Sequence, residues 1–304
     1  MTAEMTTATA TATGTEGGPR FVPRRSKRWS AQVRWVRHGV QAVFALWVVV
    51  ALGQRVFATS ATSIETVCPF GGFETAWTWI TTGRTVPHTH TANLVVGGVV
   101  AVLAVAARGF FCGWVCVLGS LQESVRAIGR RIEHAIPAMR RLRLEPGPRL
   151  DRVLRLGRYA VLAWALGGAA ITGTMVFRTV DPWAALLSVV EFEFSTAFVV
   201  LLVMLALSLV LDRPFCRYAC PLGAVQGILA KASPVAIQRD AESCLGCDLC
   251  NRACPMGLPV NERTRVTDAS CIGCLQCVAA CPSEDALSLT ISYPTRHGRT
   301  EQHV

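Results

Sequence analysis

Long, nearly unbroken apolar stretches dominate the first two thirds of the chain. Four of them approach the roughly 20 residues that a helix needs to cross a hydrocarbon core. They cover about 39–58, 92–107 with a continuation through 110–121, 156–177 and 194–211. This pattern predicts a membrane all-α region at 38–235 with four transmembrane helices, and the alternative is the buried core of a large soluble protein.

Arginine and lysine are distributed unevenly around these stretches, and their distribution predicts an orientation. Seven of them lie within 20–37, eleven within 108–158 and nine within 213–299, whereas the two remaining loops carry only Arg84 and Arg178. Because cytoplasmic loops are enriched in Lys and Arg, we expect a multi-pass protein of the inner (cytoplasmic) membrane with both termini on the cytoplasmic side. The composition agrees, since only 16% of the residues are charged, against about 25% in an average soluble domain.

Three further segments are interpreted from their composition. Residues 1–37 open with a Thr- and Ala-rich stretch and are expected to form a disordered basic cytoplasmic tail, and 292–304 form a second tail. Between Val125 and Met139, apolar residues recur at helical spacing among arginines. This spacing predicts a basic amphipathic helix on the inner leaflet, with membrane lipid as its partner and protein docking as the alternative.

The densest chemical pattern lies in residues 236–291, where four cysteines are spaced Cys-x2-Cys-x2-Cys-x3-Cys-Pro twice in succession. In bacterial ferredoxins such runs hold two [4Fe–4S] clusters, and the fourth cysteine of each run ligates the other cluster. The sequence therefore predicts a small C-terminal α+β ferredoxin domain that carries single electrons. Zinc, the alternative, uses cysteine pairs separated by a longer loop, and disulfides are disfavoured in the reducing cytosol. The expected ligands are Cys244, Cys247, Cys250 and Cys281 for one cluster, and Cys271, Cys274, Cys277 and Cys254 for the other.

A shorter cysteine motif occurs twice, at 112–116 and 216–220. When the chain is aligned with itself at an offset of 104, the Phe, both Cys, the Leu, the Gly and the Gln of the motif coincide. The repetition predicts a tandem two-helix repeat with both copies in one orientation, and such repeats often form a site where they meet. Cysteines four residues apart share one helix face, so a third cluster or another thiolate-bound metal could form there; in the alternative, the thiols only pack and the motif docks the ferredoxin domain. The candidate ligands of this third site are Cys112, Cys116, Cys216 and Cys220.

Together these features resemble the NapH-type membrane polyferredoxins, which are quinol-dehydrogenase subunits, and the related membrane part of the nitrous-oxide-reductase accessory flavoprotein. The resemblance rests on the twin Phe-Cys-x3-Cys-(Pro)-Leu-Gly strings, the four spans, the trailing ferredoxin and the string Val67–Glu74. It implies electron transfer between the membrane quinone pool and a partner protein. Val117 stands where the family usually has proline.

The expected function is that of a membrane-bound iron–sulfur protein that passes electrons between quinone and a redox partner, with quinol dehydrogenation as the candidate enzyme activity. The alternatives are an accessory or maturation factor that delivers electrons to a metal, flavin or thiol of another complex, and a redox sensor. His88 and His90, just before the second span, are candidates for accepting quinol protons because histidine titrates near neutral pH; in the alternative, they are exposed loop histidines without a function. Cys68, on the outer side, is either a redox thiol or ligand or a buried residue of a turn. No nucleic-acid partner is expected.

Overall fold

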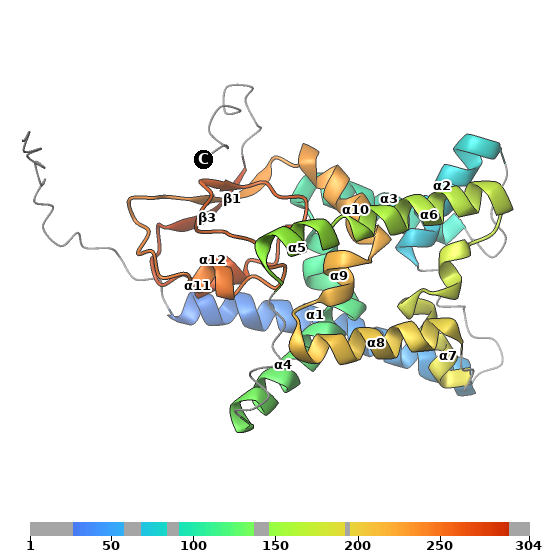
Figure 1. Cartoon of the computed structure of the whole chain (residues 1–304), viewed down its shortest axis with the longest axis horizontal. Coiled ribbons are helices and arrows are strands. Elements are labelled where there is room, and N and C mark those ends of the chain that lie inside the picture. The colour runs from blue at the N-terminus through green and yellow to red at the C-terminus, as the bar shows by residue number, and fades with distance from the viewer. Residues whose placement is uncertain (1–26, 58–67, 84–90, 137–145, 192–194, 292–304) are drawn as a thin grey trace, which may run out of the picture.

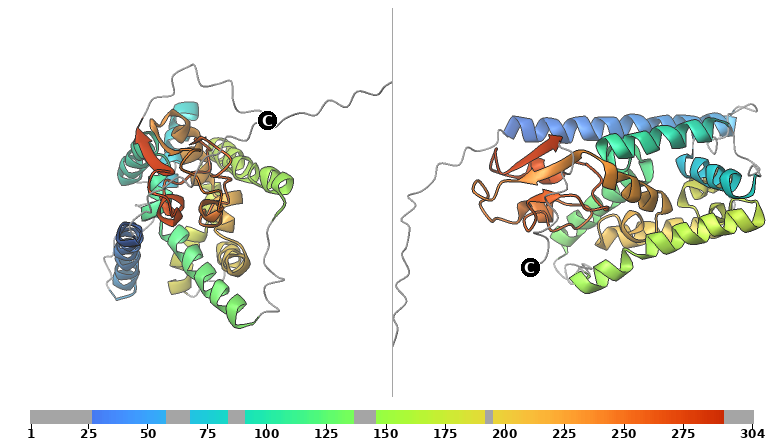
Figure 2. Two further views of the ribbon diagram at one scale, coloured as in Figure 1. Left: turned by 90° about the vertical axis from the view of Figure 1, so that its left-hand side faces the viewer. Right: turned by 90° about the horizontal axis from the view of Figure 1, so that it is seen from above.

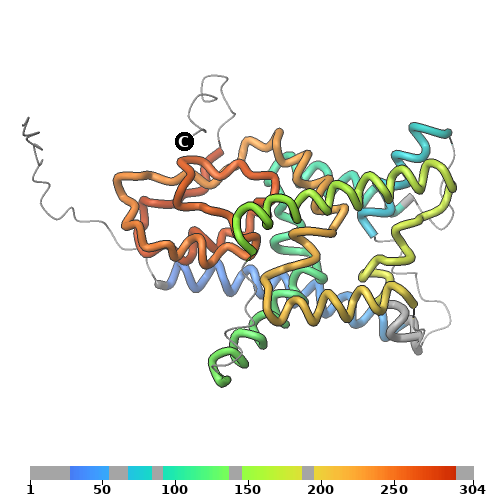
Figure 3. The backbone as a smooth tube through the Cα atoms, viewed as in Figure 1, coloured from blue at the N-terminus to red at the C-terminus, as the bar shows by residue number. Residues whose placement is uncertain are grey.

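The structure is a computed structural model that describes residues 27–57, 68–83, 91–136, 146–191 and 195–291. Helices form an elongated bundle, and a small three-stranded domain lies at one end of it (Figure 1). The backbone trace shows the chain passing back and forth through the bundle before it forms the sheet domain (Figure 3).

Four helices run along the long axis of the bundle (Figures 1 and 2). They are α1 (Lys27–Phe57), α3 (Thr91–Ala107), α6 (Gly157–Thr172) and α8 (Thr196–Val210). Valine and leucine side chains that are half exposed or more lie on α1, α3 and α8: Val43, Leu46, Val49, Val95, Val99, Val102, Val199, Leu202 and Val203. Soluble monomers rarely expose extended apolar patches, so these faces indicate a partner or a lipid environment.

Three of the four predicted transmembrane helices, α3, α6 and α8, are shorter in the structure than in the sequence pattern. Among the described residues, one helix is long and apolar enough to cross a membrane, over Arg28–Gln54 of α1, while α3 and α8 are shorter apolar helices. The second apolar stretch is interrupted at Arg108, whose φ of 59° is left-handed, and it resumes as a π-helix, η2 (Phe111–Val115). The third stretch ends as a helix at Thr172, because Gly173 adopts a φ of 69° and caps it.

Short helices close the two ends of the bundle. At the end far from the sheet lie α2 (Pro69–Thr82), η4 (Val176–Thr179) and α7 (Pro182–Glu191) (Figure 1). Near the sheet domain are α5 (Pro148–Leu154), α9 (Pro214–Tyr218), α10 (Pro221–Leu229) and η5 (Ala230–Ala232). Each of these α-helices starts with proline, whose fixed φ suits the first helical position and whose missing N–H costs nothing there.

The basic helix predicted from the arginine spacing forms as α4 (Val117–Ala135), but one of its basic residues faces the protein. Arg126 is buried, and its Nη1 donates to the carbonyl oxygen of Leu209 in α8 and pairs with Glu133. Gly129 lies against the same carbonyl, with no room for a Cβ, whereas Ile128 is half exposed. The expectation that the arginines of this helix face lipid is therefore wrong for Arg126, because close helix packing at Gly129 decides which face is buried.

The first helix also begins earlier than the sequence predicted. Residues 27–37, which composition assigned to the disordered tail, are helical. Arg37 is buried; it donates through Nε to the carbonyl oxygen of Gly113 at 2.9 Å and pairs through Nη2 with Glu123 at 2.7 Å. These contacts of Arg37 with η2 and α4 hold the start of the first helix against the rest of the protein. The rest of the two predicted tails, 1–26 and 292–304, lies outside the described residues.

The sheet domain has three antiparallel strands in the order β2-β1-β3. They are β1 (Val235–Arg239), β2 (Arg265–Val266) and β3 (Leu287–Ile291). Ile237 at the centre of β1 pairs with Val266 on one side and Leu289 on the other. Two short helices, α11 (Leu249–Arg252) and α12 (Gln276–Ala280), complete this small α+β domain.

The sheet domain packs directly on the bundle through η2. Gly113 lies against the carbonyl oxygen of Ile272, in a space that a larger residue could not share. The indole Nε1 of Trp114 donates to the carbonyl oxygen of Gly273 at 3.1 Å, and Arg108 donates to that of Val235 at 2.9 Å. The left-handed break at Arg108 thus anchors the end of α3 to the first strand of the sheet.

Candidate functional site

The eight cysteines of the two C-terminal runs line two separate cavities in the sheet domain. Each cavity combines the first three cysteines of one run with the last cysteine of the other. One is lined by Cys244, Cys247, Cys250 and Cys281. The other is lined by Cys254, Cys271, Cys274 and Cys277.

The chain turns in the same way around both cavities. Gly246 and Gly273 have φ angles of 64° and 58°, and Asp248 and Leu275, two residues later, each have a φ of 57°. Left-handed conformations at two closely spaced positions reverse the chain twice within one run. Helix α11 or α12 follows at once and carries the third cysteine of its run. The spacing of two residues between cysteines is therefore what lets one loop surround a cavity.

The donor set of these cavities fits iron–sulfur clusters. Burial raises the pKa of the Cys274 thiol to about 12, and the neighbouring Cys254 adds to the rise. A thiolate in such surroundings needs a bound cation, and coordination to a metal deprotonates the thiol. In the part of the chain that the structure describes, no three His, Cys, Asp or Glu side chains are close enough to hold a single metal ion. Four thiols around a cavity suit a larger, multi-iron group.

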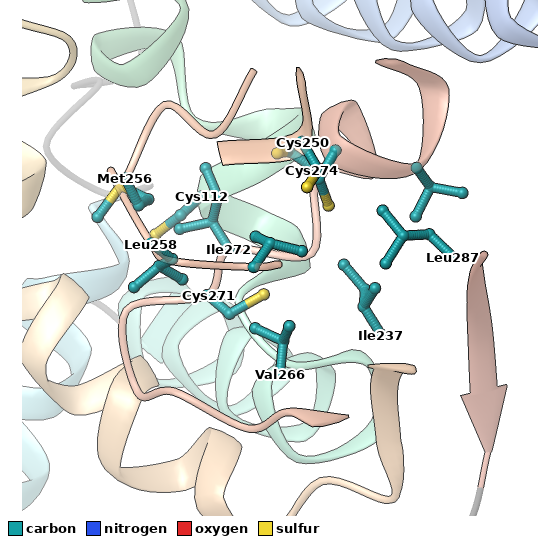
Figure 4. Packing of buried hydrophobic residues seen from close by; sticks show 13 residues of the cluster. Cys112, Ile237, Cys250, Met256, Leu258, Val266, Cys271, Ile272, Cys274 and Leu287 are labelled. Atoms are coloured by element: carbon teal, nitrogen blue, oxygen red, sulfur yellow. The ribbon is translucent and has the colours of Figure 1, made fainter. Parts of the chain in front are cut away.

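The two cavities differ in their surroundings. Cys247 and Leu245 line the first cavity and are both exposed. In the second cavity, Cys271, Cys274 and Cys277 are buried in the same apolar core as Cys112 of η2 (Figure 4). The first cavity therefore lies near the surface, and the second borders the helical bundle.

The two Cys-x3-Cys motifs adopt closely similar backbone structures. The backbone N–H of Cys116 donates to the carbonyl oxygen of Phe111, and that of Cys220 donates to Phe215, both at 2.9 Å. Cys116 and Cys220 each have a ψ of 114° and each cap the helix that follows, α4 or α10. The repeat seen in the sequence is thus also present in the backbone.

The four thiols of these motifs lie near one another where the two copies face each other. Cys112, Cys116, Cys216 and Cys220 all lie within electrostatic range of one another. Gln122 donates through Nε2 to the Cys216 sulfur and accepts through Oε1 from the N–H of Phe215, both at 3.2 Å. Gln226, which occupies the same position in the second copy, is also buried, yet neither of its amide atoms has a hydrogen-bond partner among the described residues. The two copies therefore differ in the hydrogen bonding of their equivalent glutamines.

An ion-pair network lies beside the thiols. Glu123 pairs with Arg37 at 2.7 Å and with Arg213 at 3.0 Å, and Arg213 also donates to the carbonyl oxygen of Cys112 at 2.7 Å. Burial disfavours the charged form of Glu123, but the two guanidinium groups outweigh it and hold the pKa of that carboxyl below its usual value. The network ties α1, α4 and the start of α9 to the first motif.

A third cavity lies at the far end of the bundle and was missed by the sequence analysis. It is lined by Cys68, Phe70, Gly71, Glu74, Met175, Phe177, Arg178, Asp181, Trp183 and Ala184. Burial raises the pKa of Glu74 to about 8 and that of Asp181 to about 7. Glu74 is the single charged residue of α2, a signal that could have identified it. Asp181 reaches the cavity from a distant segment and leaves no comparable local signal.

The histidines proposed to accept quinol protons are not placed by the structure. His88 and His90 lie within 84–90, outside the described residues. Cys68, by contrast, is partly buried and lines the far cavity.

Both cysteine patterns lie within matches to known iron–sulfur protein families. A family described as "4Fe-4S dicluster domain" matches residues 236–282. A second family, described as "4Fe-4S binding domain", matches twice, over 89–134 and 195–239, and each match contains one Cys-x3-Cys motif. No solved structure matches the chain.

Curated relatives are named as electron-transport, ferredoxin-type or regulatory proteins. The chain is 26% identical to "Putative electron transport protein YccM" of Escherichia coli, over 69% of this chain and 58% of that protein. It is 28% identical to "Ferredoxin-type protein NapH" of Haemophilus influenzae over 55% of each chain, and 30% identical to "Regulatory protein NosR" of Pseudomonas aeruginosa over 48% of this chain and 20% of that one. The chain thus spans less than two thirds of the length of these relatives. The resemblance found in the sequence is confirmed: the chain is a relative of the NapH-type polyferredoxins. It carries 4Fe-4S domains like those of ferredoxin-type electron-transport proteins.

Proposed function

We propose that this protein passes electrons between the membrane quinone pool and a redox partner through two [4Fe–4S] clusters. The observation that carries the proposal is the pair of four-cysteine cavities in a domain that packs on an apolar helical bundle. A [4Fe–4S] cluster supplies reversible one-electron transfer when it is bound. The proposed ligands are Cys244, Cys247, Cys250 and Cys281 for one cluster, and Cys271, Cys274, Cys277 and Cys254 for the other.

The residues around the two cavities give each a different role in this proposal. Leu245 and Cys247 are exposed at the first cavity, and such an exposed rim suits transient docking of a redox partner. The loop from Cys271 to Cys274 lines the second cavity, and it contacts η2 of the bundle at Gly113. The bundle side of this contact is the proposed route to the quinone.

The bundle is proposed to cross the inner membrane with α1, α3, α6 and α8. The exposed apolar side chains on α1, α3 and α8, and Ile171 on α6, support this proposal. At 1.5 Å per residue, the 17 residues of α3 span about 25 Å, close to a hydrocarbon core of about 30 Å. Arginine is enriched at the sheet-domain end, so both termini and the ferredoxin domain are proposed to be cytoplasmic.

The paired Cys-x3-Cys motifs are proposed to dock the ferredoxin domain, while their four thiols only pack. The contacts of η2 with the second cavity favour docking, and Cys112, Cys116 and Cys220 pack in three different apolar clusters. Anaerobically purified protein is therefore expected to contain about eight irons, two cubanes of four, and to keep them after Cys112→Ser and Cys216→Ser. About twelve irons, falling to about eight in the variant, would instead identify a third cluster at the junction.

The direct test of the proposal is anaerobic mixing of cluster-loaded protein with a menaquinol analogue, and of reduced protein with the quinone. We expect rapid changes in cluster absorbance and EPR signal in at least one direction, because the proposal makes the clusters the electron acceptors or donors of the quinone pool. The matched control is the same protein after its iron has been removed. It should show no change in absorbance or EPR signal on mixing.

The second candidate function is that of an accessory factor that delivers electrons to another complex, and Cys68 is the residue that bears on it. Burial raises the pKa of the Cys68 thiol to about 12, and Asp181 adds to the rise, so little reactive thiolate exists near neutral pH. This disfavours a thiol-exchange role and places the accessory function second. Intact clusters that exchange no electrons with quinol or quinone would reverse this order.

A further inference from the structure

The far cavity carries polar groups that the iron–sulfur chemistry does not use. It lies between α2 and the segment from η4 to α7, at the end of the bundle opposite the ferredoxin domain (Figures 1 and 2). Glu74 is 1% exposed, and its Oε1 has no hydrogen-bond partner among the described residues. The indole Nε1 of Trp183 likewise has none there. Buried polar atoms without a partner are costly, so such atoms at a cavity point to a missing ligand.

The walls between these polar groups are aromatic and apolar. Phe70 and Phe177 meet edge to face with their ring centroids 5.2 Å apart, and both line the cavity. Asp181 accepts from the backbone N–H of Trp183 at 3.0 Å, and both residues line the cavity. The cavity therefore combines aromatic rings with an indole N–H and carboxyl groups among its lining residues.

We propose that this cavity binds the ring of a quinone or quinol, with Glu74 and the Trp183 indole as hydrogen-bonding partners of its oxygens. A quinone is a flat apolar ring with carbonyl acceptors, and a quinol carries hydroxyl donors at the same positions. The indole N–H donates to either form. The carboxyl group of Glu74 donates to a quinone oxygen when it is protonated and accepts from a quinol hydroxyl when it is ionised. The inference rests on the proposed function, because it names the place where the quinone would bind.

The test is equilibrium binding of a short-chain menaquinone analogue to the full chain in phospholipid nanodiscs, followed by quenching of tryptophan fluorescence. Glu74→Leu is expected to weaken binding at least tenfold, because one hydrogen bond in an apolar site is lost. The same variant should unfold at the same temperature or a higher one without ligand, since it removes a buried carboxyl group that has no partner at Oε1. Glu262→Leu, at an exposed position of the ferredoxin domain, is the control and should change neither quantity.

A second variant keeps the proposal testable if Glu74→Leu fails to fold. Trp183→Phe removes the Nε1 donor but keeps an aromatic wall, and it is also expected to weaken binding at least tenfold. Unchanged affinity in either folded variant would overturn the proposal. The failure of the proposed function looks different: the wild-type protein would then bind the analogue in this cavity but exchange no electrons with it.

The pH dependence of binding gives an independent readout. Wild-type affinity for the quinone is expected to fall as the pH rises through about 7 to 8, because Asp181 and then Glu74, whose pKa is about 8, become negative beside the carbonyl oxygens. The other ionisable groups lining the cavity are Cys68, whose pKa of about 12 keeps it neutral here, and the positive Arg178. Glu74→Leu should remove the part of the decline near pH 8, and an unaltered profile would contradict the assignment.

Discussion

Replacing Glu123 with glutamine is expected to destabilise the protein by about 3–5 kcal/mol, the range for breaking a buried ion pair from one side. Glu123 neutralises two guanidinium groups, those of Arg37 and Arg213, and both are no more than 1% exposed. The variant would leave two buried positive charges without their carboxylate. Because the same arginines hold the carbonyl oxygens of Cys112 and Gly113, the contact between bundle and ferredoxin domain should weaken as well.

The effect can be measured as a drop in the midpoint of thermal unfolding in detergent, with Glu262→Gln at an exposed position as the control. The pKa of Glu123 lies below its usual value in the folded protein. Its contribution is therefore complete above the unfolded pKa of about 4.3 and is lost as the pH falls through the folded pKa. The gap between wild type and variant should narrow in acid, and equal midpoints at neutral pH would show that the network does not support the fold.

Replacing Cys254 with alanine is expected to remove the same cluster as replacing Cys274, although the two cysteines belong to different runs. Cys254 lines the cavity of Cys271, Cys274 and Cys277, whereas Cys281 lines the other one. Iron content should fall from about eight to about four atoms in each variant. The expected loss is large because the thiol supplies one quarter of a cluster's protein ligands.

EPR of the reduced protein separates the two clusters and tests the crossed pairing. Cys254→Ala and Cys274→Ala should leave the same remaining signal, and Cys281→Ala and Cys247→Ala should leave the other. Cys68→Ala, which lies at the far end of the bundle, should keep both signals. A shared signal between Cys254→Ala and Cys247→Ala would instead mean that each run holds its own cluster.

The ferredoxin region was predictable from sequence because its geometry is local. Two residues between cysteines, with left-handed positions at Gly246 and Gly273, are enough to wrap one loop around a cavity. The repeat was predictable for the same reason, since the turn from Phe111 to Cys116 recurs from Phe215 to Cys220 with the same hydrogen bond. The ligand assignment and the four membrane spans stay predictions.

The arginines show where the sequence pattern reached its limit. Their uneven distribution was interpreted as charge on cytoplasmic loops, but Arg37, Arg108, Arg126 and Arg213 are buried in the structure. Each donates to a backbone carbonyl of a distant element or pairs with a carboxylate. Counting charges along the chain gives the number of arginines and the side of the bundle on which they are expected. It gives no information about the carbonyl and carboxylate groups that they bind.

By itself the sequence determined the cysteine runs, the duplicated motif and the apolar stretches, because each depends on residues a few positions apart. Only the tertiary structure decided which charges meet. Glu123 lies 86 residues from Arg37 and 90 from Arg213, and Glu74 faces a cavity completed by Asp181 and Trp183 from another segment. Side chains so far apart in sequence are brought together when the helices pack on each other. No spacing pattern within a short stretch of sequence indicates that packing.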